Sequence, residues 1–521
     1  MGAKAHRTVT ADRYDKAVTH ISRRSLILAA AGIGLSRHAA AQGLEPGRSV
    51  TADPFALGVA SGDPSLDGFV IWTRLVGALG EALDAPAVPV AYEIAADEGF
   101  RRIVRAGRIA ASPRLGHSVH VEVAGLEPGR PYWYRFHALG VASPAGRAAT
   151  APRHAASARI AVTSCQHYEQ AWFSAYRDLV AAQPDLVVQL GDYIYEISYP
   201  TGVKVRRFGA PEPTDLDGYR RRHALYKTDP DLRAAHAAAP WIVTWDDHDV
   251  QNDYADLANL GAADPAVFAR RRAAAYQAYF EHMPVRPSRW AGPAGPRLYR
   301  HIAWGDLFAM PVLDGRQYRS AQACNPERLA GNRMVADCAR IDAPDRTMLG
   351  AAQETWLSRM LGAPQPAWTL IAQQTVVAPI NLAGGVMTDQ WDGYAAARSR
   401  LLGDLSRPQV RNAVILSGDI HSFWVNDVRR GASGPVVAAE FATSCLAAGL
   451  APKARYADAM ARNPHIRFSG LDNAGYVLIE MTPKALTADL RAVSDAADPA
   501  ASVTSLARFG VEDGRPGAVA A

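Results

Sequence analysis

Four short polar segments of this chain contain the residue types that bind metals or transfer protons. Each directly follows a run of apolar residues that is typical of a buried strand, and the segments lie at 164–167, 191–196, 246–249 and 418–421. In α/β sheets, ligands bind beyond the carboxyl ends of the strands, so segments that are far apart in the sequence can meet there. We therefore predict a single site that is assembled from four strand ends.

The side chains in these segments indicate a metal site. They include three carboxylates, two imidazoles, a thiol and a phenol: Asp192, Asp247, Asp419, His248, His421, Cys165 and Tyr195. Oxygen donors with a few nitrogen and sulfur donors suit a site that holds several cations. The carboxylates and imidazoles alone could bind zinc, manganese or magnesium. A thiolate together with a phenolate favours a strongly Lewis-acidic ion, which we infer to be ferric iron.

The segment 246–249 carries the strongest electrostatic signal. It places Asp246, Asp247 and Asp249 around His248 within a stretch of four residues. Carboxylates this close repel one another and raise each other's pKa unless a cation lies among them. A solvated turn is the alternative for this segment alone, but four unrelated turns do not explain the whole pattern.

The region from 43 to 150 has the hydrophobic pattern of an antiparallel β-sandwich. Short apolar or alternating runs are separated there by turn residues, as in sandwiches of about 100 residues. The runs lie at 69–72, 88–94, 118–123 and 132–136. A stretch rich in Ala, Pro and Ser at 142–158 is expected to link this domain to the next.

After residue 159, apolar strands alternate with helices, which predicts a layered α/β domain from 155 to 490. A helix is expected at 170–182 and should end before Pro184. We expect 491–521 to be a C-terminal tail of short helix and coil. The predicted strands lie at 159–163, 185–190, 241–245, 370–377, 413–416 and 476–481.

Residues 1–41 have the features of a secretory signal peptide. Arg23 and Arg24 precede an apolar run at 26–35, and the alanines at 39–41 offer a cleavage site. The run is shorter than the roughly 20 apolar residues of a transmembrane helix, and no later stretch approaches that length. The arginine pair favours the twin-arginine pathway, with a Sec signal as the alternative. We therefore predict export by the twin-arginine machinery to the periplasm or the extracellular space. That route carries folded proteins, which often hold a metal.

Charge gives no support for specific nucleic-acid binding. The net charge is +5, but seven of the 56 basic and two of the 51 acidic residues lie in 1–41, which leaves 49 of each. A neutral remainder does not form a global basic surface. The composition, with 49% hydrophobic and 21% charged residues, is that of an ordinary globular protein.

Four cysteines divide into two settings. Cys324 and Cys338 flank a polar loop, and an oxidising compartment favours a disulfide between them. Cys445 is expected to be a small buried residue. Cys165 belongs to the predicted metal site.

The polar segments resemble the motifs of metallophosphoesterases. The segment 191–195 is similar to GDxxY, 246–249 resembles GNH[DE], and 418–421 resembles GHxH. Ser164 and Cys165 stand where the superfamily has DxH, and the other two motifs read Asp-Asp-His and Gly-Asp-x-His. These departures are those of the PhoD-type alkaline phosphatases. Further similarity lies at 55–64, 71–75, 245–254, 313–319 and 463–466, so the resemblance covers about 22–485.

This resemblance implies a fold and a set of ligands. The fold is a four-layer αββα metallophosphoesterase sandwich preceded by a fibronectin-like β-sandwich, and the metals are ferric iron (Fe3+) and calcium (Ca2+). By this resemblance Asp192 would bridge the iron to a calcium ion. The implied iron ligands are Cys165, Asp192, Tyr195 and His421, and the implied calcium ligands are Asp247, Asn252 and Asp419. How Asp246, Asp247 and Asn252 divide between ligands and supporting residues stays open.

The expected activity is the hydrolysis of small-molecule phosphate mono- or diesters. Cations would clamp the phosphate oxygens while a metal-bound oxide or hydroxide attacks phosphorus in line. His248 is placed to stabilise charge or to protonate the leaving oxygen; alternatively it is structural and water supplies the proton. Arg316 is a candidate to grip the phosphate, or else it forms a salt bridge that supports the fold. We expect a monomer.

Other functions fit parts of the pattern. A phospholipase D-like phosphodiesterase would use the same site, and an iron oxidoreductase would use Cys165 and Tyr195 as ligands. A non-catalytic binding protein built on the β-sandwich has no reason to keep four intact polar segments. The basic stretch at 200–228 is either a lid that attracts anionic substrate or a solvated loop and helix face.

Overall fold

The computed structural model describes residues 53–77, 81–290, 292 and 295–521. The predicted signal peptide at 1–41 lies outside these residues. The largest sheet of the described residues has ten strands in the order β24-β23-β22-β21-β9-β10-β11-β1-β2-β5. Its strands are β1 (Val59–Ser65), β2 (Gly68–Arg74), β5 (Ser118–Val123), β9 (Ala158–Thr163), β10 (Leu186–Gln189), β11 (Pro240–Val243), β21 (Gly475–Met481), β22 (Ala485–Val493), β23 (Val503–Glu512) and β24 (Arg515–Ala520).

The second sheet has seven strands in the order β12-β13-β15-β17-β19-β18-β20. Its central strands β13, β15, β17 and β19 are parallel, as are β9, β10 and β11 of the first sheet. Its strands are β12 (Arg300–Trp304), β13 (Phe308–Val312), β15 (Trp368–Ala372), β17 (Ala413–Ser417), β18 (Phe423–Arg429), β19 (Val436–Ala442) and β20 (Ile466–Gly470).

Side chains that alternate between the two faces of each strand explain why the fold has four layers. Val188 of β10 and Val414 of β17 belong to one apolar core that lies between the sheets. The neighbouring Val187 packs with the helices outside the first sheet, and Ile415 packs with those outside the second. Successive side chains of a strand point to opposite faces, so both sheets are covered on both sides.

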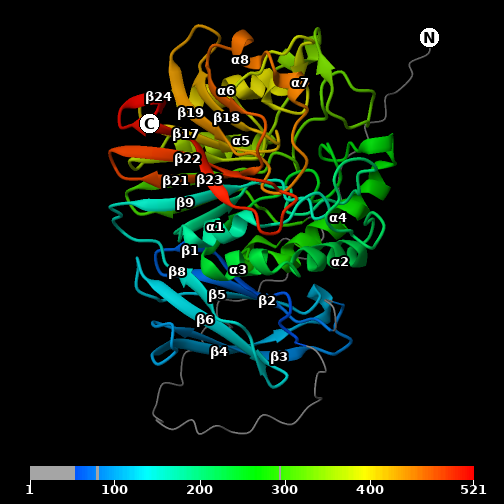
Figure 1. The fold of residues 1–521 in the computed structure, drawn as a ribbon, viewed down its shortest axis with the longest axis vertical. Coiled ribbons are helices and arrows are strands. Elements are labelled where there is room, and N and C mark those ends of the chain that lie inside the picture. The colour runs from blue at the N-terminus through cyan, green and yellow to red at the C-terminus, as the bar shows by residue number, and fades with distance from the viewer. Residues whose placement is uncertain (1–52, 78–80, 291, 293–294) are drawn as a thin grey trace, which may run out of the picture. The chain divides into compact units, whose positions relative to one another are not determined.

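Helices form the two outer layers of this αββα sandwich (Figure 1). Leu179, Tyr219, Leu232 and Tyr276 of the first four helices join the outer core of the ten-stranded sheet. The helices are α1 (Ala175–Ala181), α2 (Leu216–Tyr226), α3 (Pro230–Ala238), α4 (Pro265–His282), α5 (Ala351–Leu361), α6 (Ala395–Leu405), α7 (Lys453–Tyr456) and α8 (Ala459–Arg462). None of the helices in the described part of the chain combines the length and the apolar character that crossing a bilayer requires.

The predicted N-terminal β-sandwich is present, but it shares a sheet with the following domain. Its separate sheet contains β3 (Val88–Ala95), β4 (Ile103–Ala111), β6 (Pro131–Ala138), β7 (Val141–Ala142) and β8 (Gly146–Ala149). This sheet packs on β2 and β5. Because β1 pairs in parallel with β11, β1, β2 and β5 extend the ten-stranded sheet. Gly62 allows this approach, since a Cβ there would lie 2.6 Å from the carbonyl oxygen of Trp241 in β11.

The prediction of a helix-and-coil tail at 491–521 is wrong. β22, β23 and β24 form an antiparallel edge of the ten-stranded sheet, and Phe509 and Val511 are buried between the two sheets. Asp513 and Gly514 connect β23 to β24, with Glu512 paired to Arg515. An Asp-Gly pair between alternating residues is a strong hairpin signal that the sequence interpretation missed.

Two predicted elements are shorter than expected because tertiary contacts use their backbone. The helix expected at 170–182 begins at Ala175, since Trp172 donates its N–H to Ala496 and the Ala171 carbonyl accepts from Arg206. The strand expected at 370–377 ends at Ala372. Beyond it, the N–H of Val377 donates to the carboxylate of Glu440 at 2.7 Å.

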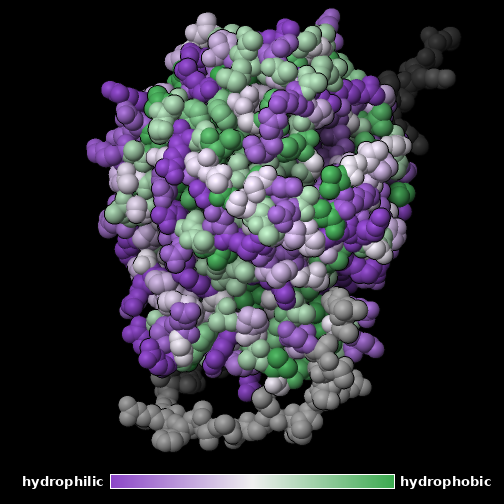
Figure 2. Space-filling model, viewed as in Figure 1, coloured by the Kyte–Doolittle hydropathy of each residue, from purple (hydrophilic) through white to green (hydrophobic). Residues whose placement is uncertain are grey.

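The predicted disulfide between Cys324 and Cys338 is confirmed, with Cα atoms 6.2 Å apart. Cys445 is buried and free, as expected. Figure 2 shows hydrophilic and hydrophobic side chains interspersed over the visible face. Val203, Val267 and Val519 are 61%, 51% and 59% exposed and lie in three separate segments, so they are scattered surface residues.

Candidate metal centre

The four predicted polar segments converge where their strands end. Three of them follow β9, β10 and β11, which are adjacent in the ten-stranded sheet, and the fourth follows β17 of the opposite sheet. Four of the predicted ligands have a left-handed backbone: Cys165 (φ 55°), Asp192 (φ 53°), Asp419 (φ 65°) and His421 (φ 53°). Such conformations cost energy in residues other than glycine and cluster at functional sites. The backbone therefore turns sharply at the positions where donor atoms must face one point.

The thiol, phenol and imidazole predicted as iron ligands surround Asp192. The Sγ of Cys165 lies 3.5 Å from Asp192 Oδ2, and the Tyr195 hydroxyl lies 3.0 Å from the same oxygen. That hydroxyl is also 2.9 Å from Nε2 of His421. The other ring nitrogen of His421 donates to the carbonyl of Gly449 at 2.6 Å, so Nε2 is left to face the site. The four predicted iron ligands thus form one contiguous group.

Burial controls the protonation of this group. It raises the pKa of the Cys165 thiol and of the Tyr195 phenol well above their ordinary values, and the charge of Asp192 adds to both shifts. Burial also raises the pKa of Asp192, with Asp247 contributing, and lowers the pKa of His421 to about 4. A cation that binds here must displace protons from the thiol and the phenol.

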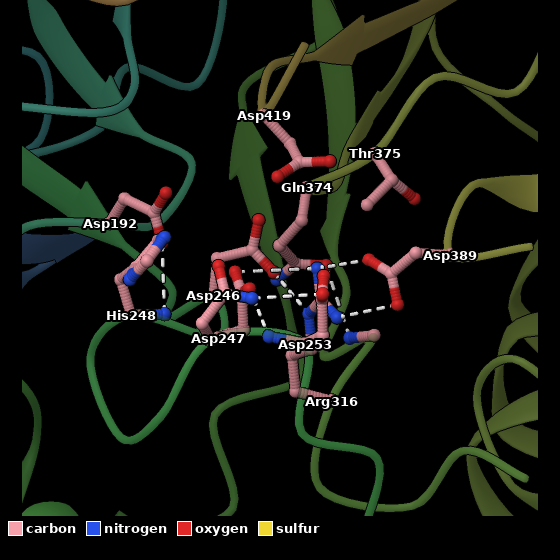
Figure 3. A network of polar contacts seen from close by, with 12 residues as sticks. Asp192, Asp246, Asp247, His248, Asp253, Arg316, Gln374, Thr375, Asp389 and Asp419 are labelled. Atoms are coloured by element: carbon pink, nitrogen blue, oxygen red, sulfur yellow. Dashed lines mark hydrogen bonds and ion pairs between the residues drawn. The ribbon is translucent and has the colours of Figure 1, made fainter. Parts of the chain in front are cut away.

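A cluster of four carboxylates adjoins these donors. One oxygen from each of Asp192, Asp246, Asp247 and Asp419 lies within 4.8 Å of the others. Figure 3 shows these side chains turned toward a common centre from opposite sides, with Arg316 beneath them. The sequence did not decide whether Asp246 is a ligand or a supporting residue. In the structure, Asp246 belongs to the carboxylate cluster.

Arg316 is the cation that the structure places against this cluster. It is fully buried; its Nε donates to Asp246, and its Nη2 lies 3.4 Å from Asp247 Oδ1 and 2.8 Å from Asp389 Oδ2. Burial opposes ionisation of Asp247, but Arg316 and His248 outweigh it and lower the pKa of Asp247 to about 2. These contacts support the salt-bridge interpretation of Arg316 over the phosphate-gripping one.

The residues present fit hard cations. One guanidinium cannot balance the carboxylates around it, and the buried Oδ2 of Asp246 has no hydrogen-bond partner among the described residues. Within the part of the chain that the structure describes, Asp247 Oδ1 likewise accepts no hydrogen bond, and it forms an ion pair of 3.4 Å with Arg316. All-oxygen donors suit calcium, and the neighbouring thiol, phenol and imidazole suit a transition metal. The structure thus presents two adjoining donor sets of different chemistry.

His248 lies beside both donor sets and has a fixed orientation. Its Nδ1 is 2.7 Å from Glu196 Oε2, its Nε2 is 3.2 Å from the Tyr199 hydroxyl, and its ring stacks on Tyr195 at 4.1 Å. Burial favours the neutral imidazole, but Glu196 and the other anions nearby outweigh it and raise the pKa of His248 well above its ordinary value. The contacts with Glu196, Tyr199 and Tyr195 therefore fix the ring with Nε2 on the side of the Tyr199 hydroxyl.

Asn252 lies at the edge of the carboxylate cluster. Its side-chain amide donates to Asp253 Oδ2 at 2.8 Å, and its backbone N–H donates to Glu196 Oε1 at 2.7 Å. Asp253 in turn donates its N–H to Asp247 Oδ2 at 2.6 Å. The structure thus connects Asn252 to the cluster through Asp253.

Asp249 holds two of the strand ends together. Its carboxylate accepts the N–H groups of Asp192 at 3.0 Å, Ile194 at 3.2 Å and Asp246 at 2.9 Å. Burial raises the pKa of Asp249 to about 7. The oxygens of Asp249 accept hydrogen bonds from backbone N–H groups, whereas its neighbour Asp247 belongs to the carboxylate cluster.

The sequence interpretation missed several residues of the site. Glu196 lies in the predicted polar segment 191–196, but the sequence interpretation assigned it no role. Asp389 and Gln390 follow β16 (Val386–Met387), a strand of two residues that is too short to be recognised from the sequence. Asp389 pairs with Arg316, and the Gln390 side chain donates to Asp419 and accepts the N–H of Val376 at 2.7 Å.

Three of the five arginines in the basic stretch at 200–228 are engaged in contacts within the fold. Arg206 pairs with Asp229 at 2.6 Å and lies over the ring of Tyr168, and Arg220 pairs with Glu281 at 2.7 Å. Arg222 is 3% exposed and donates to the carbonyl groups of the site segment. These side chains hold the fold together.

Two parts of the chain match one family of known proteins. Residues 160–490 match the family described as PhoD-like phosphatase, and residues 39–152 match the N-terminal domain of that family. Alkaline phosphatase D of Bacillus subtilis (strain 168) is 41% identical over 475 residues, which cover 88% of this chain and 80% of that protein. A solved structure described as "Structure of PhoD" has a TM-score of 0.85 at 40% identity, covering 91% of this chain and 93% of that one.

Proposed function

The chain belongs to the PhoD-like phosphatase family and is a phosphoric ester hydrolase, and we propose that it is an exported alkaline phosphatase that uses ferric iron and calcium. The observation that carries this proposal is that Asp192 belongs to both donor sets. Asp192 faces the thiol and phenol with Oδ2, and it shares the carboxylate cluster with Asp246, Asp247 and Asp419.

We assign the metals by the chemistry of the donors. Iron is assigned to Cys165, Asp192, Tyr195 and His421, and calcium to Asp192, Asp247 and Asp419, with Asn252 as a more distant candidate because its amide donates to Asp253. When bound, these cations supply Lewis acidity that spreads the charge of the phosphoryl group and makes water a better nucleophile. Asp246 is assigned to both the cluster and the salt bridge with Arg316.

Arg316 and Asp249 are proposed to hold the carboxylates and loops of the site in place, and His248 is proposed to transfer a proton. Arg316 keeps Asp246 and Asp247 in place while remaining fully buried, so its proposed role is to hold carboxylates. His248 presents Nε2 toward the half-buried Tyr199 at the site. We assign to Nε2 the proton that the leaving oxygen receives. Asp249 keeps the loops of Asp192 and Asp246 aligned.

We further propose that residues 1–41 direct export by the twin-arginine machinery. The Arg23-Arg24 pair before a short apolar run supports this route. A destination in the periplasm or outside the cell agrees with the disulfide between Cys324 and Cys338, because such bonds persist in oxidising compartments. The protein is proposed to act as a monomer on small-molecule phosphate esters.

Hydrolysis of matched p-nitrophenyl mono- and diesters tests this function. Protein exported in the folded state should release p-nitrophenol at neutral to alkaline pH, and a chelator should abolish the release. The faster of the two esters identifies the substrate class, including the phosphodiesterase alternative. Failure to hydrolyse either ester by protein that carries iron and calcium contradicts the proposed function.

A further inference from the structure

We infer that the loop closed by the disulfide between Cys324 and Cys338 positions the calcium side of the site through Asn332, an inference that rests on the proposed function. Residues 324–338 are called the disulfide loop. Asn332 lies in this loop and contacts two residues that support the carboxylate cluster. Breaking the disulfide should therefore weaken calcium binding and leave the iron in place.

Asn332 bridges two segments that reach the carboxylate cluster. Its backbone N–H donates to Asp253 Oδ2 at 2.9 Å, and its side-chain Oδ1 accepts the N–H of Asp389 at 3.2 Å. Asp253 donates its own N–H to Asp247 Oδ2 at 2.6 Å. Asp389 Oδ2 lies 2.8 Å from Nη2 of Arg316. Asn332 therefore reaches the cluster through Asp253 and its counter-cation through Asp389.

The disulfide loop also holds the segment that carries Gln390. Its strand β14 (Met334–Val335) pairs antiparallel with β16. Beside this pairing, the N–H of Thr388 donates to the carbonyl of Arg333 at 2.9 Å, and the N–H of Arg333 donates to the Thr388 hydroxyl at 2.9 Å. Gln390 follows two residues later and donates to Asp419. The loop therefore supports carboxylates that follow strands of both sheets.

Few apolar contacts hold the disulfide loop in its conformation. Ala330 is the one buried residue among residues 324–338, all of which the structure describes. Hydrogen bonds add support: the N–H of Ala330 donates to the carbonyl of Asn259 at 3.0 Å, and the Asn325 amide donates to the carbonyl of Gly331 at 2.8 Å. A loop without a core regains conformational freedom when its covalent closure is removed. The position of the loop therefore depends on its disulfide.

The proposed iron ligands are held by other parts of the chain. The N–H of Tyr195 donates to the Tyr226 hydroxyl at 2.9 Å. His421 donates to the carbonyl of Gly449 at 2.6 Å. Neither partner belongs to the disulfide loop. Calcium requires several oxygen ligands at once, so a displaced loop should weaken calcium binding and spare the iron.

Calcium binding to the double variant Cys324→Ser/Cys338→Ser tests this inference. Equilibrium dialysis against radioactive calcium, after bound calcium has been removed with a calcium-selective chelator, measures the dissociation constant. Mass spectrometry measures iron in the same samples. The variant should bind calcium about 10-fold more weakly at unchanged iron content, because residues that support metal ligands contribute about 10–100-fold to metal affinity. Substitution is preferred to a reductant, because a reductant would also act on ferric iron.

Asn332→Ala separates the contact from the disulfide. It removes the acceptor of the Asp389 N–H while the disulfide stays, and it should also weaken calcium binding without loss of iron. Val511→Ala is the matched control. It shortens a side chain of β23 that is buried between the two sheets, so it lowers stability away from the disulfide loop. This control should keep the wild-type calcium affinity.

The variants decide the inference. An unchanged calcium affinity in either Asn332→Ala or the double variant overturns it, as does an equal loss of both metals or the same loss in Val511→Ala. If the double variant does not fold, Asn332→Ala decides alone. The proposed function is decided on the wild type instead: a wild type that carries no calcium overturns the metal assignment, and one that hydrolyses neither ester overturns the activity.

Discussion

Asp192 connects the two donor sets of the site more directly than any other side chain described here. Its Oδ2 contacts Cys165 and Tyr195, and its Oδ1 accepts the N–H of His248 at 3.2 Å. It also belongs to the carboxylate cluster. Loss of its charge should therefore weaken both proposed metal positions.

Asp192→Asn should reduce hydrolysis by more than about 100-fold, because even residues that only support metal ligands cost about 10–100-fold. Metal content and kcat/KM measure the effect together. Asp178→Asn is the control, since Asp178 pairs with Arg491 at 2.7 Å and is 22% exposed. Asp192→Asn protein with wild-type metals and activity would show that the assigned bridge is wrong.

The sequence could predict the residues that sit at strand ends, because apolar runs mark where strands stop. Cys165, Asp192 and His421 were found in this way. Asp389 could not be found, since it comes from a loop and acquires its role only through its contacts with Arg316. The role of Arg316 depends on carboxylates from several segments, which no local pattern reveals.

At the scale of elements, the turn after β10 must pass very close to the turn after β11. Gly191 has φ 117°, and a Cβ there would lie 2.4 Å from the Cβ of Asp246 and 2.6 Å from its backbone nitrogen. Only glycine adopts this conformation without strain. The close approach is what brings Asp192 beside Asp246 and Asp247. The two loops could be predicted from the sequence, but the distance between them could not, because their contact joins residues that follow different strands.

Gly191→Ala should therefore push the Asp246 loop away and reduce both stability and metal content. Forcing a side chain into such a backbone costs about 1–3 kcal/mol before the clash is counted. Gly403→Ala makes the same change inside α6, where a Cβ would meet nothing within 4 Å. That control should gain about 0.5–1 kcal/mol instead. Urea unfolding of both variants measures the contrast, and equal effects would contradict this account of the Gly191 turn.

At the scale of the whole molecule, a set of buried bases lies between the sandwich strand β2 and helices α2 and α4. The rings of His223 and His282 stack at 4.9 Å, and Arg74 Nη1 lies 2.6 Å from His282 Nε2. Neither ring nitrogen of His223 has a hydrogen-bond partner in residues 53–77, 81–290, 292 and 295–521, and Lys227 lies 4.5 Å from the ring centre of Trp72. Burial lowers the pKa of His223, His282 and Lys227 well below their ordinary values.

Stability should fall as the pH drops through the ordinary histidine value of 6.5, because the unfolded chain then takes up protons that the folded protein excludes. His223→Phe should flatten this fall by about 1.4 kcal/mol per pH unit below that value. Urea unfolding from about pH 8 to about pH 5 measures the slope. His154→Gln, whose side chain is 87% exposed, should leave the slope unchanged. An unchanged slope in His223→Phe would contradict the neutral state of this imidazole.

The measurement that tests the central claim most directly is the metal content of three proteins: the wild type, Cys165→Ser and Asp247→Asn. The account predicts iron and calcium in the wild type, loss of iron in Cys165→Ser, and loss of calcium with retention of iron in Asp247→Asn. Mass spectrometric metal analysis of the folded, exported proteins gives the answer. Zinc or magnesium in place of these metals, or unchanged iron in Cys165→Ser, would contradict it.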